Sequence, residues 1–354
     1  MTRTTTRLTA ALGTAALLAV AGCSVSVGNE GSGADDSTVT LLTHDSFALP
    51  DELLAEFEER SGMTLELVRS GDAGSLTNQL VLSKDEPVGD VVFGIDNTFA
   101  SRAVEAGVLA EYVSVELPGS GGEYTLDGEG VELLTPVDWG DVCVNVDDAW
   151  FRDKGIRPPR TLEDLTDPTY EGLFVTPAAS TSSPGFAFLL ATIGEYGEDG
   201  WRDYWQRLMD NGARVVAGWT DAYEVDFTAG GGGGDRPIVL SYNSSPPFTI
   251  PEGGKRPTTS ALLDTCFRQV EYAGVLEGTD NRDGAEALVD FLVSPEVQKA
   301  LPDSMYVFPV DDSVDLPPLW ARWAEPAPEP VEVDPDAIAE NREDWLREWS
   351  DLTS

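Results

Sequence analysis

Residues 38–97 read TVTLLTHDSFALPDELLAEFEERSGMTLELVRSGDAGSLTNQLVLSKDEPVGDVVFGIDN. Three short apolar runs in this segment, VTLL, LELV and VVF, have the length and composition of buried strands. The apolar residues between them recur at helical spacing, as Leu53, Leu54 and Phe57 do. Because strands that alternate with helices are typical of α/β proteins, the segment predicts a mostly parallel, doubly wound sheet.

The alternation continues more loosely along the rest of the chain, and a second α/β lobe is the simplest interpretation. After a Pro-rich passage at 317–330, a last amphipathic helix is expected at about 335–351. The remaining expected strands and helices lie at 141–144, 173–175, 186–196, 201–209, 237–241, 267–275, 285–293 and 295–301.

Composition restricts the function. The 354 residues include 63 acidic and 22 basic side chains, which gives a net charge of −41. Nucleic-acid binding needs clustered Lys and Arg, so this charge excludes it, and the same field favours cationic small molecules. The hydrophobic content of 41% is high enough for a folded core.

The N-terminus has the pattern of an export signal. Arg3 and Arg7 precede an apolar run from 8 to 21, and the segment ends in VAGC at Cys23. This ending resembles the lipobox of bacterial lipoproteins, in which the Cys becomes the lipidated first residue; the alternative is an unmodified Cys in the leader. We expect a signal peptide at 1–22, a flexible tether at 23–37 and anchoring to the outer face of the cytoplasmic membrane.

The other two cysteines, Cys143 and Cys266, permit one disulfide in an exported protein, with two separate buried thiols as the alternative. His44 is the single histidine and there is no CxxC motif, so zinc binding or a His-based triad has little support. The glycine run at 230–234 lacks the Lys and Ser/Thr of a phosphate-binding loop and is interpreted as a surface turn.

In open α/β sheets the ligand lies beyond the carboxyl ends of the strands. The loops expected there are rich in aromatic, acidic and hydroxyl side chains: 43–47, 71–74, 94–97, 136–140, 181–185, 218–223 and 240–246.

Several residues of these loops also fit structural roles. Trp219 and Tyr223 are four apart and fit an apolar helix face, while Asp96 and Asp221 fit helix caps. The serines at 182–183 fit either a cap or a helix start whose amides hold an anion. Trp139 fits a core position at a hinge.

The segments THDSF (43–47), DVVFGIDN (90–97), TSSPG (181–185), GWTDAY (218–223), LSYNSSP (240–246) and FLVSPEVQ (291–298) occur in this order. Together they resemble the thiamine-binding proteins of bacterial ABC importers, across essentially the whole mature chain. The resemblance implies a two-lobed type II periplasmic-binding-protein fold and capture of thiamine, or its mono- and diphosphate, without cofactor or catalysis. It also implies a monomer that delivers the ligand to ABC permease and ATPase subunits.

Carried over by position, the resemblance assigns ring contacts to His44, Trp219, Tyr242 and Tyr306, and polar contacts to Asp72, Ala73 and Ser182. His44 stands where the family often has Tyr, and Tyr306 where Trp is common. Both remain planar rings, so stacking is retained.

The chemistry of thiamine agrees with this assignment. A thiazolium cation over an aromatic face gains roughly 0.5–2 kcal/mol, and a nearby carboxylate such as Asp72, Asp138 or Asp221 offsets the cost of burying the charge. The aminopyrimidine needs directed polar groups, such as Ser46, Asn97 and Ser182. The complete predicted set is His44, Asp45, Ser46, Asp72, Ala73, Asn97, Asp138, Trp139, Ser182, Trp219, Tyr223, Tyr242, Ser244 and Tyr306.

We expect lobe 1 at 38–138 and 268–311 and lobe 2 at 139–267 and 312–354, joined near 137–141 and 265–270 and closing by hinge bending. Other functions stay open. A receptor of the same fold for ferric iron or a polyamine would need paired phenolates or an acidic aromatic cleft, respectively. An exported hydrolase would need a nucleophile beside His44, or a carboxylate pair as in glycosidases.

Overall fold

The computed structural model describes residues 37–354. The predicted signal peptide, Cys23 and all of the predicted tether except its last residue lie outside the described residues. Within 37–354, no helix is both long enough and apolar enough to span a membrane.

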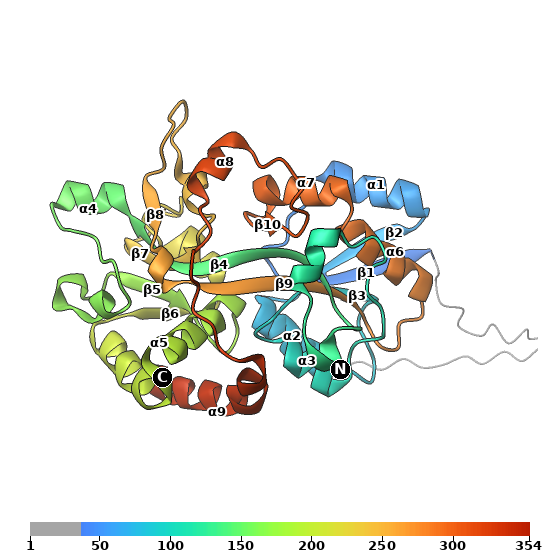
Figure 1. Ribbon diagram of the computed structural model, residues 1–354, viewed down its shortest axis with the longest axis horizontal. Coiled ribbons are helices and arrows are strands. Elements are labelled where there is room, and N and C mark those ends of the chain that lie inside the picture. The colour runs from blue at the N-terminus through green and yellow to red at the C-terminus, as the bar shows by residue number, and fades with distance from the viewer. Residues whose placement is uncertain (1–36) are drawn as a thin grey trace, which may run out of the picture. The chain divides into compact units, whose positions relative to one another are not determined.

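Residues 38–106 form the predicted strand and helix alternation. Strand β1 pairs in parallel with both β2 and β3, and β3 is buried along its whole length. Two of the following helices lie on one face of these strands and α1 on the other (Figure 1). The elements are β1 (Thr38–Thr43), α1 (Asp51–Ser61), β2 (Thr64–Arg69), α2 (Ala73–Leu82), β3 (Val91–Asp96) and α3 (Ala100–Ala106).

Two long antiparallel strands occupy the centre of the sheet. Strand β4 (Thr135–Asp147) pairs with β9 (Phe267–Val275), and β9 also runs antiparallel to β3. They lie side by side across the middle of the molecule and connect the strands on its two sides (Figure 1). The sheet order is β2-β1-β3-β9-β4-β7-β5-β6, so the expected parallel pairing holds on each side, whereas the centre is antiparallel.

The second side repeats the layered arrangement with β5 (Phe174–Pro177), β6 (Arg214–Val216) and β7 (Ile238–Tyr242). Both β6 and β7 pair in parallel with β5. Helix α5 (Ser183–Asp210) consists of two helical stretches that meet at Gly197, whose φ of 70° interrupts the helix. The predicted helices at 186–196 and 201–209 are therefore confirmed.

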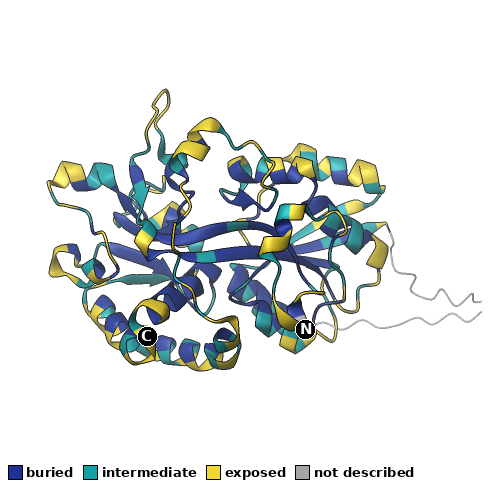
Figure 2. Ribbon diagram, viewed as in Figure 1, coloured by how far each residue is buried: buried dark blue, intermediate teal, exposed yellow. Residues whose placement is uncertain are grey.

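The C-terminal helix α9 (Pro335–Thr353) lies beside α5 (Figure 1). Its buried Trp349 meets Trp205 of α5 edge to face, with ring centroids 5.5 Å apart. The inward faces of the helices are buried and the outward faces exposed (Figure 2). The other elements are α4 (Asp148–Lys154), β8 (Thr259–Ala261), α6 (Arg282–Leu292), α7 (Pro295–Ser304), β10 (Phe308–Pro309) and α8 (Pro318–Trp323).

A disulfide joins Cys143 of β4 to Cys266, the residue before β9. This is the pairing that the sequence permits, and it closes a sequence separation of 123 residues. Both cysteines are fully buried. A loop of this length gives a chain-entropy stabilisation of about 4–5 kcal/mol, and the crosslink fixes the two central strands to each other.

Candidate functional site

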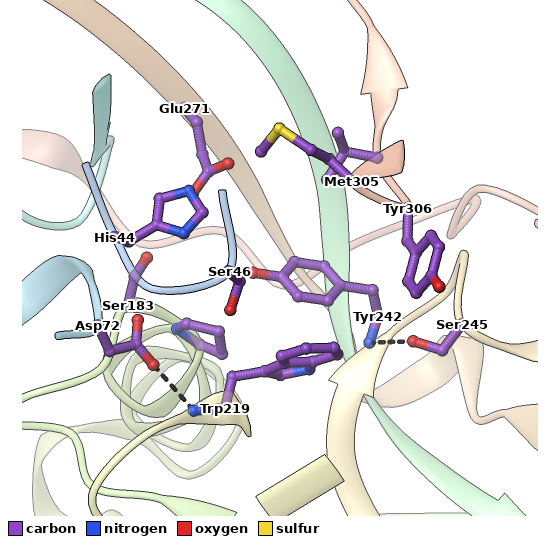
Figure 3. A pocket seen from close by; sticks show the side chains of 12 residues that line it. His44, Ser46, Asp72, Ser183, Trp219, Tyr242, Ser245, Glu271, Met305 and Tyr306 are labelled. Atoms are coloured by element: carbon purple, nitrogen blue, oxygen red, sulfur yellow. Dashed lines mark hydrogen bonds and ion pairs between the residues drawn. The ribbon is translucent and has the colours of Figure 1, made fainter. Parts of the chain in front are cut away.

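A cavity lies where strand ends and helix starts from both sides of the sheet meet, as expected for an open α/β sheet. His44 follows β1, Asp72 caps α2, and Tyr242 ends β7. The side chains of these residues surround a common space (Figure 3). The cavity has a volume of about 510 Å³, counting the part open to solvent, and is lined by His44, Ser46, Asp72, Ser183, Pro184, Trp219, Tyr242, Ser245, Glu271, Met305, Tyr306 and Val307.

One part of the cavity wall is aromatic, and Trp219 is held firmly within it. The Trp219 ring stacks on Tyr223 with centroids 5.0 Å apart and an interplanar angle of 10°. Its Nε1 donates a hydrogen bond to Ser241 Oγ at 2.9 Å. With one face on Tyr223 and its ring nitrogen already bonded, Trp219 offers a fixed planar surface for stacking a flat ligand.

Tyr306 provides a second ring, which stacks on Phe248 with centroids 3.3 Å apart. It is the one non-glycine residue of 37–354 with a positive φ, 64°. The Ser244 hydroxyl donates a hydrogen bond to the Tyr306 carbonyl oxygen and helps to hold this conformation. Left-handed backbone at a bulky residue is energetically costly and is found at functional sites.

Asp72 connects the two sides of the cavity. Its carboxylate accepts hydrogen bonds from the backbone N–H of Ala73 at 2.7 Å and of Trp219 at 2.9 Å (Figure 3 shows the second). Burial raises the pKa of Asp72, and the hydrogen bonds from Trp219, Ser182 and Ala73 counteract that rise. Asp72 therefore caps α2 and positions the loop that carries the aromatic surface.

Asp96 stabilises the turn that precedes α3, whose N-cap is Phe99 and not Asp96. It accepts hydrogen bonds from Thr98 N, Thr98 Oγ1 and Phe99 N at 2.8–3.2 Å, and from the Ser183 hydroxyl. Burial raises its pKa to about 6. The neighbouring Asn97 bonds through its side chain to the backbone of Arg268 and Val270 in β9, so it supports the sheet and does not line the cavity.

His44, Glu271 and Asp138 form a buried polar group at the other part of the wall. His44 Nε2 lies 3.7 Å from Glu271 Oε1 (Figure 3), and burial, followed by the charge of Arg69, lowers the pKa of His44 to about 4. His44 is therefore neutral at pH 7. Asp138 is directly opposite Glu271 in the register of β4 and β9.

Six predicted residues line the cavity: His44, Ser46, Asp72, Trp219, Tyr242 and Tyr306. Among the others, Asp45 is exposed and accepts a hydrogen bond from Gly71 N, and Ser182 is the buried N-cap of α5. Trp139 stacks between Phe308 and Tyr124, which matches the alternative of a core position.

The remaining predicted residues stand behind the wall, where they support residues that line it. Ala73 contributes its buried backbone, Tyr223 stacks on Trp219, Ser244 bonds to the Tyr306 carbonyl oxygen, and Asp138 lies directly opposite Glu271 on the neighbouring strand. None of these four residues lines the cavity itself.

Six lining residues are absent from the predicted set: Ser183, Pro184, Ser245, Glu271, Met305 and Val307. Ser183 and Ser245 belong to loops that the sequence had already singled out, and Met305 and Val307 flank Tyr306. Glu271 had a different signal, namely a charged residue in the middle of an apolar strand pattern, VEYAGV. Acids are rare in such positions and mark functional sites when they occur.

The cavity at the strand ends of a sheet with parallel strands on two sides is an arrangement suited to binding a small solute. Residues 52–328 match the family model of bacterial extracellular solute-binding proteins, and the chain belongs to that family. Its fold is the two-lobed type II fold of periplasmic binding proteins.

Named relatives sharpen the comparison. The chain is 29% identical over 325 residues to the thiamine-binding periplasmic protein of Escherichia coli, covering 89% of this chain and 93% of that protein. A solved structure of a periplasmic thiamin binding protein superposes with a TM-score of 0.77 at 27% identity, covering 90% and 96% of the two chains. A ferric binding protein from Campylobacter jejuni, with a TM-score of 0.69 at 16% identity and coverage of 89% and 99%, shares the fold.

Proposed function

We propose that this chain is an extracytoplasmic receptor that captures thiamine, with its mono- and diphosphate as further candidate ligands, and delivers it to an ABC transporter. The single observation that carries the proposal is the composition of the cavity wall. Three aromatic rings, Trp219, Tyr242 and Tyr306, face the carboxylates of Asp72 and Glu271. The relatives named as thiamine-binding proteins support the same ligand.

The wall suits a flat organic cation. Stacking over Trp or Tyr stabilises a thiazolium ring, and a buried carboxylate balances its charge. Ser46 and Ser245 supply hydroxyls at the same wall, and hydroxyls of this kind can orient an aminopyrimidine. No Lys or Arg lines the cavity of the described chain, so a cationic ligand meets no repelling side chain there.

Ferric iron is a second candidate because two iron uptake proteins are 24% and 21% identical to this chain. Iron would need ionised phenolates as ligands, whereas the Tyr242 hydroxyl donates a hydrogen bond to Gln269 Oε1. Among the described residues, no group of three or more His, Cys, Asp or Glu side chains could hold a metal ion. A polyamine has the positive charge that the cavity favours, but it has no flat ring to stack on the aromatic side chains of the wall.

The proposed role does not include catalysis. Two of the three serine hydroxyls that line the cavity already have a partner: Ser183 donates to Asp96, and Ser245 shares a hydrogen bond with Ser241 at 2.8 Å. His44, the single histidine, faces Glu271. These contacts support a role in binding rather than hydrolysis, because hydrolysis would use a hydroxyl paired with a base.

We also propose lobe 1 at 38–138 and 268–311 and lobe 2 at 139–267 and 312–354. The long strands β4 and β9 support these boundaries because they join the two sides of the sheet, and the packing of α9 on α5 supports the second lobe. Hinge bending near the crossings would close the cavity on its ligand. A signal peptide at 1–22 and lipidation of Cys23 would hold the receptor, as a monomer, at the outer face of the cytoplasmic membrane.

Calorimetric titration of the mature exported protein with thiamine and its two phosphate esters tests the function. Spermidine and ferric citrate serve as controls for the other candidate ligands. We expect tight one-to-one binding of thiamine and weak or no binding of the controls. The absence of both heat and thermal stabilisation with every form of thiamine would contradict the proposal.

A further inference from the structure

Two buried carboxyl groups face each other beside the cavity. Asp138 of β4 and Glu271 of β9 are direct partners in the antiparallel register. Side chains of directly opposite residues lie on the same face of a sheet, about 5 Å apart at Cβ. Asp138 is fully buried and Glu271 is 7% exposed, and of the two only Glu271 lines the cavity.

This pair differs from the other buried acids near the cavity in its hydrogen bonds. Asp72 and Asp96 each accept several hydrogen bonds from N–H or O–H donors. No hydrogen-bond donor reaches either oxygen of Asp138 within residues 37–354. Glu271 accepts one hydrogen bond, from the Gln269 amide at 3.3 Å. Burial and the small number of donors disfavour two negative charges on these directly opposite residues, so a proton shared between them is the simplest way to stabilise the pair.

The charges around Glu271 also favour a protonated carboxyl at this position. Asp96 of β3, Asp138 of β4 and Asp72 at the start of α2 all raise the pKa of Glu271, after burial as the largest cause. Tyr242 of β7 also faces it, as a neutral phenol. His44, after β1, is the one basic side chain within 4.0 Å of Glu271 in the described chain, and the exposed Arg69 lies farther away, beside His44.

Because His44 is neutral at pH 7, it does not balance a second negative charge. Its Nε2 is buried without a hydrogen-bond partner and lies at the cavity, next to Glu271. The cavity wall beside Glu271 therefore suits one more positive charge, and a ligand is what can bring it.

We propose that Asp138 and Glu271 share one proton in the empty cavity and release it to solvent when a cationic ligand binds beside Glu271. The step is balanced: the acid pair changes from one negative charge to two, the proton passes to the buffer, and the ligand adds one positive charge. Glu271 is thereby a specificity-determining residue that selects a positively charged ring over a neutral one. The inference rests on the proposed function, since thiamine is the cation used to test it.

The primary test measures proton release directly. Thiamine is titrated at about pH 7 in buffers of different ionisation enthalpy, where the slope of heat against that enthalpy counts protons. We expect close to one proton released, and an affinity that rises with pH by up to about tenfold per pH unit between about pH 6 and pH 8. Thiamine binding without proton release would overturn the inference.

Two variants separate the roles of the pair. Glu271→Gln should weaken thiamine binding by about 30-fold or more, because the cation loses its counter-charge, and should release no proton. Asp138→Asn should leave Glu271 ionised beside a neutral amide, so binding stays as tight or becomes tighter while proton release disappears. Glu277→Gln, at an exposed position soon after β9, is the matched control for loss of one negative charge and should behave like the unaltered protein.

A ligand-free measurement keeps the inference separate from the choice of ligand. Carboxyl carbon NMR of the empty protein should show a protonated carboxyl at pH 7 that disappears in Asp138→Asn. If thiamine does not bind, the proposed function fails. The NMR measurement still shows whether Asp138 and Glu271 share a proton. An empty protein in which both carboxyls are ionised at pH 7 would overturn the inference even if thiamine binds tightly.

Discussion

The aromatic and the acidic parts of the cavity wall are held in different ways. Trp219 and Tyr306 are fixed by stacking on rings behind them. The acidic part has Glu271 at its centre. Its neighbours are a neutral His44 and Asp138, whose carboxylate receives no hydrogen bond, so the negative charge there is incompletely balanced. A chain of hydrogen bonds connects the two parts, from Tyr242 to Gln269 and from Gln269 to Glu271. The difference indicates that the shape of the aromatic surface is fixed before a ligand binds, whereas the protonation of the Asp138–Glu271 pair can change on binding.

Removal of the aromatic surface should have the largest effect. Trp219→Ala deletes a fully positioned ring on which we propose that the ligand stacks, so we expect thiamine binding to weaken by about 100-fold, or roughly 3 kcal/mol. Calorimetry gives the affinity. Trp323→Ala is the matched control, since Trp323 bonds to Lys255 away from the cavity. Unchanged affinity in Trp219→Ala would contradict the stacking role.

The acidic part can be disturbed through the backbone beneath His44. A Cβ at Gly94, where φ is +100°, would lie 2.2 Å from His44 Cδ2. Gly94→Ala should therefore lower the free energy of unfolding by about 2 kcal/mol, from strain and from displacement of the ring. Gly107→Ala shares the positive φ but has open space around the new Cβ, so it should cost less. If urea unfolding shows the same loss of unfolding free energy for Gly94→Ala and Gly107→Ala, the contact with His44 is not the cause.

The two parts were also predictable to different degrees. Trp219 and Tyr242 lie in loops after strands, and a local pattern of apolar runs and polar loops is enough to find such residues. Glu271 lies inside a nine-residue strand, and its direction depends on the register between β9 and β4. Register is a tertiary property, so the sequence did not show that Glu271 faces the cavity or that Asp138 lies directly opposite it.

The same reasoning applies to the fold. The parallel strands on both sides follow from short-range alternation, which the sequence displays. The antiparallel centre does not, because β4 extends over 13 residues whereas its clearest apolar run, DVCV, covers four. Tyr306 was placed by family resemblance, but its left-handed backbone depends on the contact of Ser244 with its carbonyl oxygen.

The pH dependence of the free energy of unfolding tests the shared proton of Asp138 and Glu271, with a smaller expected effect. Burial raises the pKa of Asp138 and Glu271, so the folded protein holds a proton that the unfolded chain has lost, and stability decreases as pH rises toward the pair's pKa. The lowered pKa of His44 has the opposite sign, with stability present above 6.5 and lost as pH falls through about 4.

Above about pH 6.5 the effect of the pair should therefore dominate. We expect the free energy of unfolding of the empty protein to fall between about pH 6.5 and pH 8.5, by up to about 1.4 kcal/mol per pH unit. Asp138→Asn should make this profile flatter, and thiamine should reduce the fall in the unaltered protein. Equally steep profiles for both proteins in urea unfolding would contradict a shared proton.

The smallest expected effect concerns the phosphate esters. The N-terminus of α5 meets the cavity at Ser183 and Pro184, and a helix start of this kind can hold a phosphate. Here the carboxylates of Asp72 and Asp96 already take the nearby donors, through Ser182 and Ser183. We therefore expect thiamine to bind about fivefold more tightly than its diphosphate, and the difference to shrink at high salt because part of the repulsion is screened. Competition titrations at two salt concentrations measure the affinity ratio and its change with salt. Tighter binding of the diphosphate would show that the acidic part of the wall does not determine which charge form of the ligand binds best.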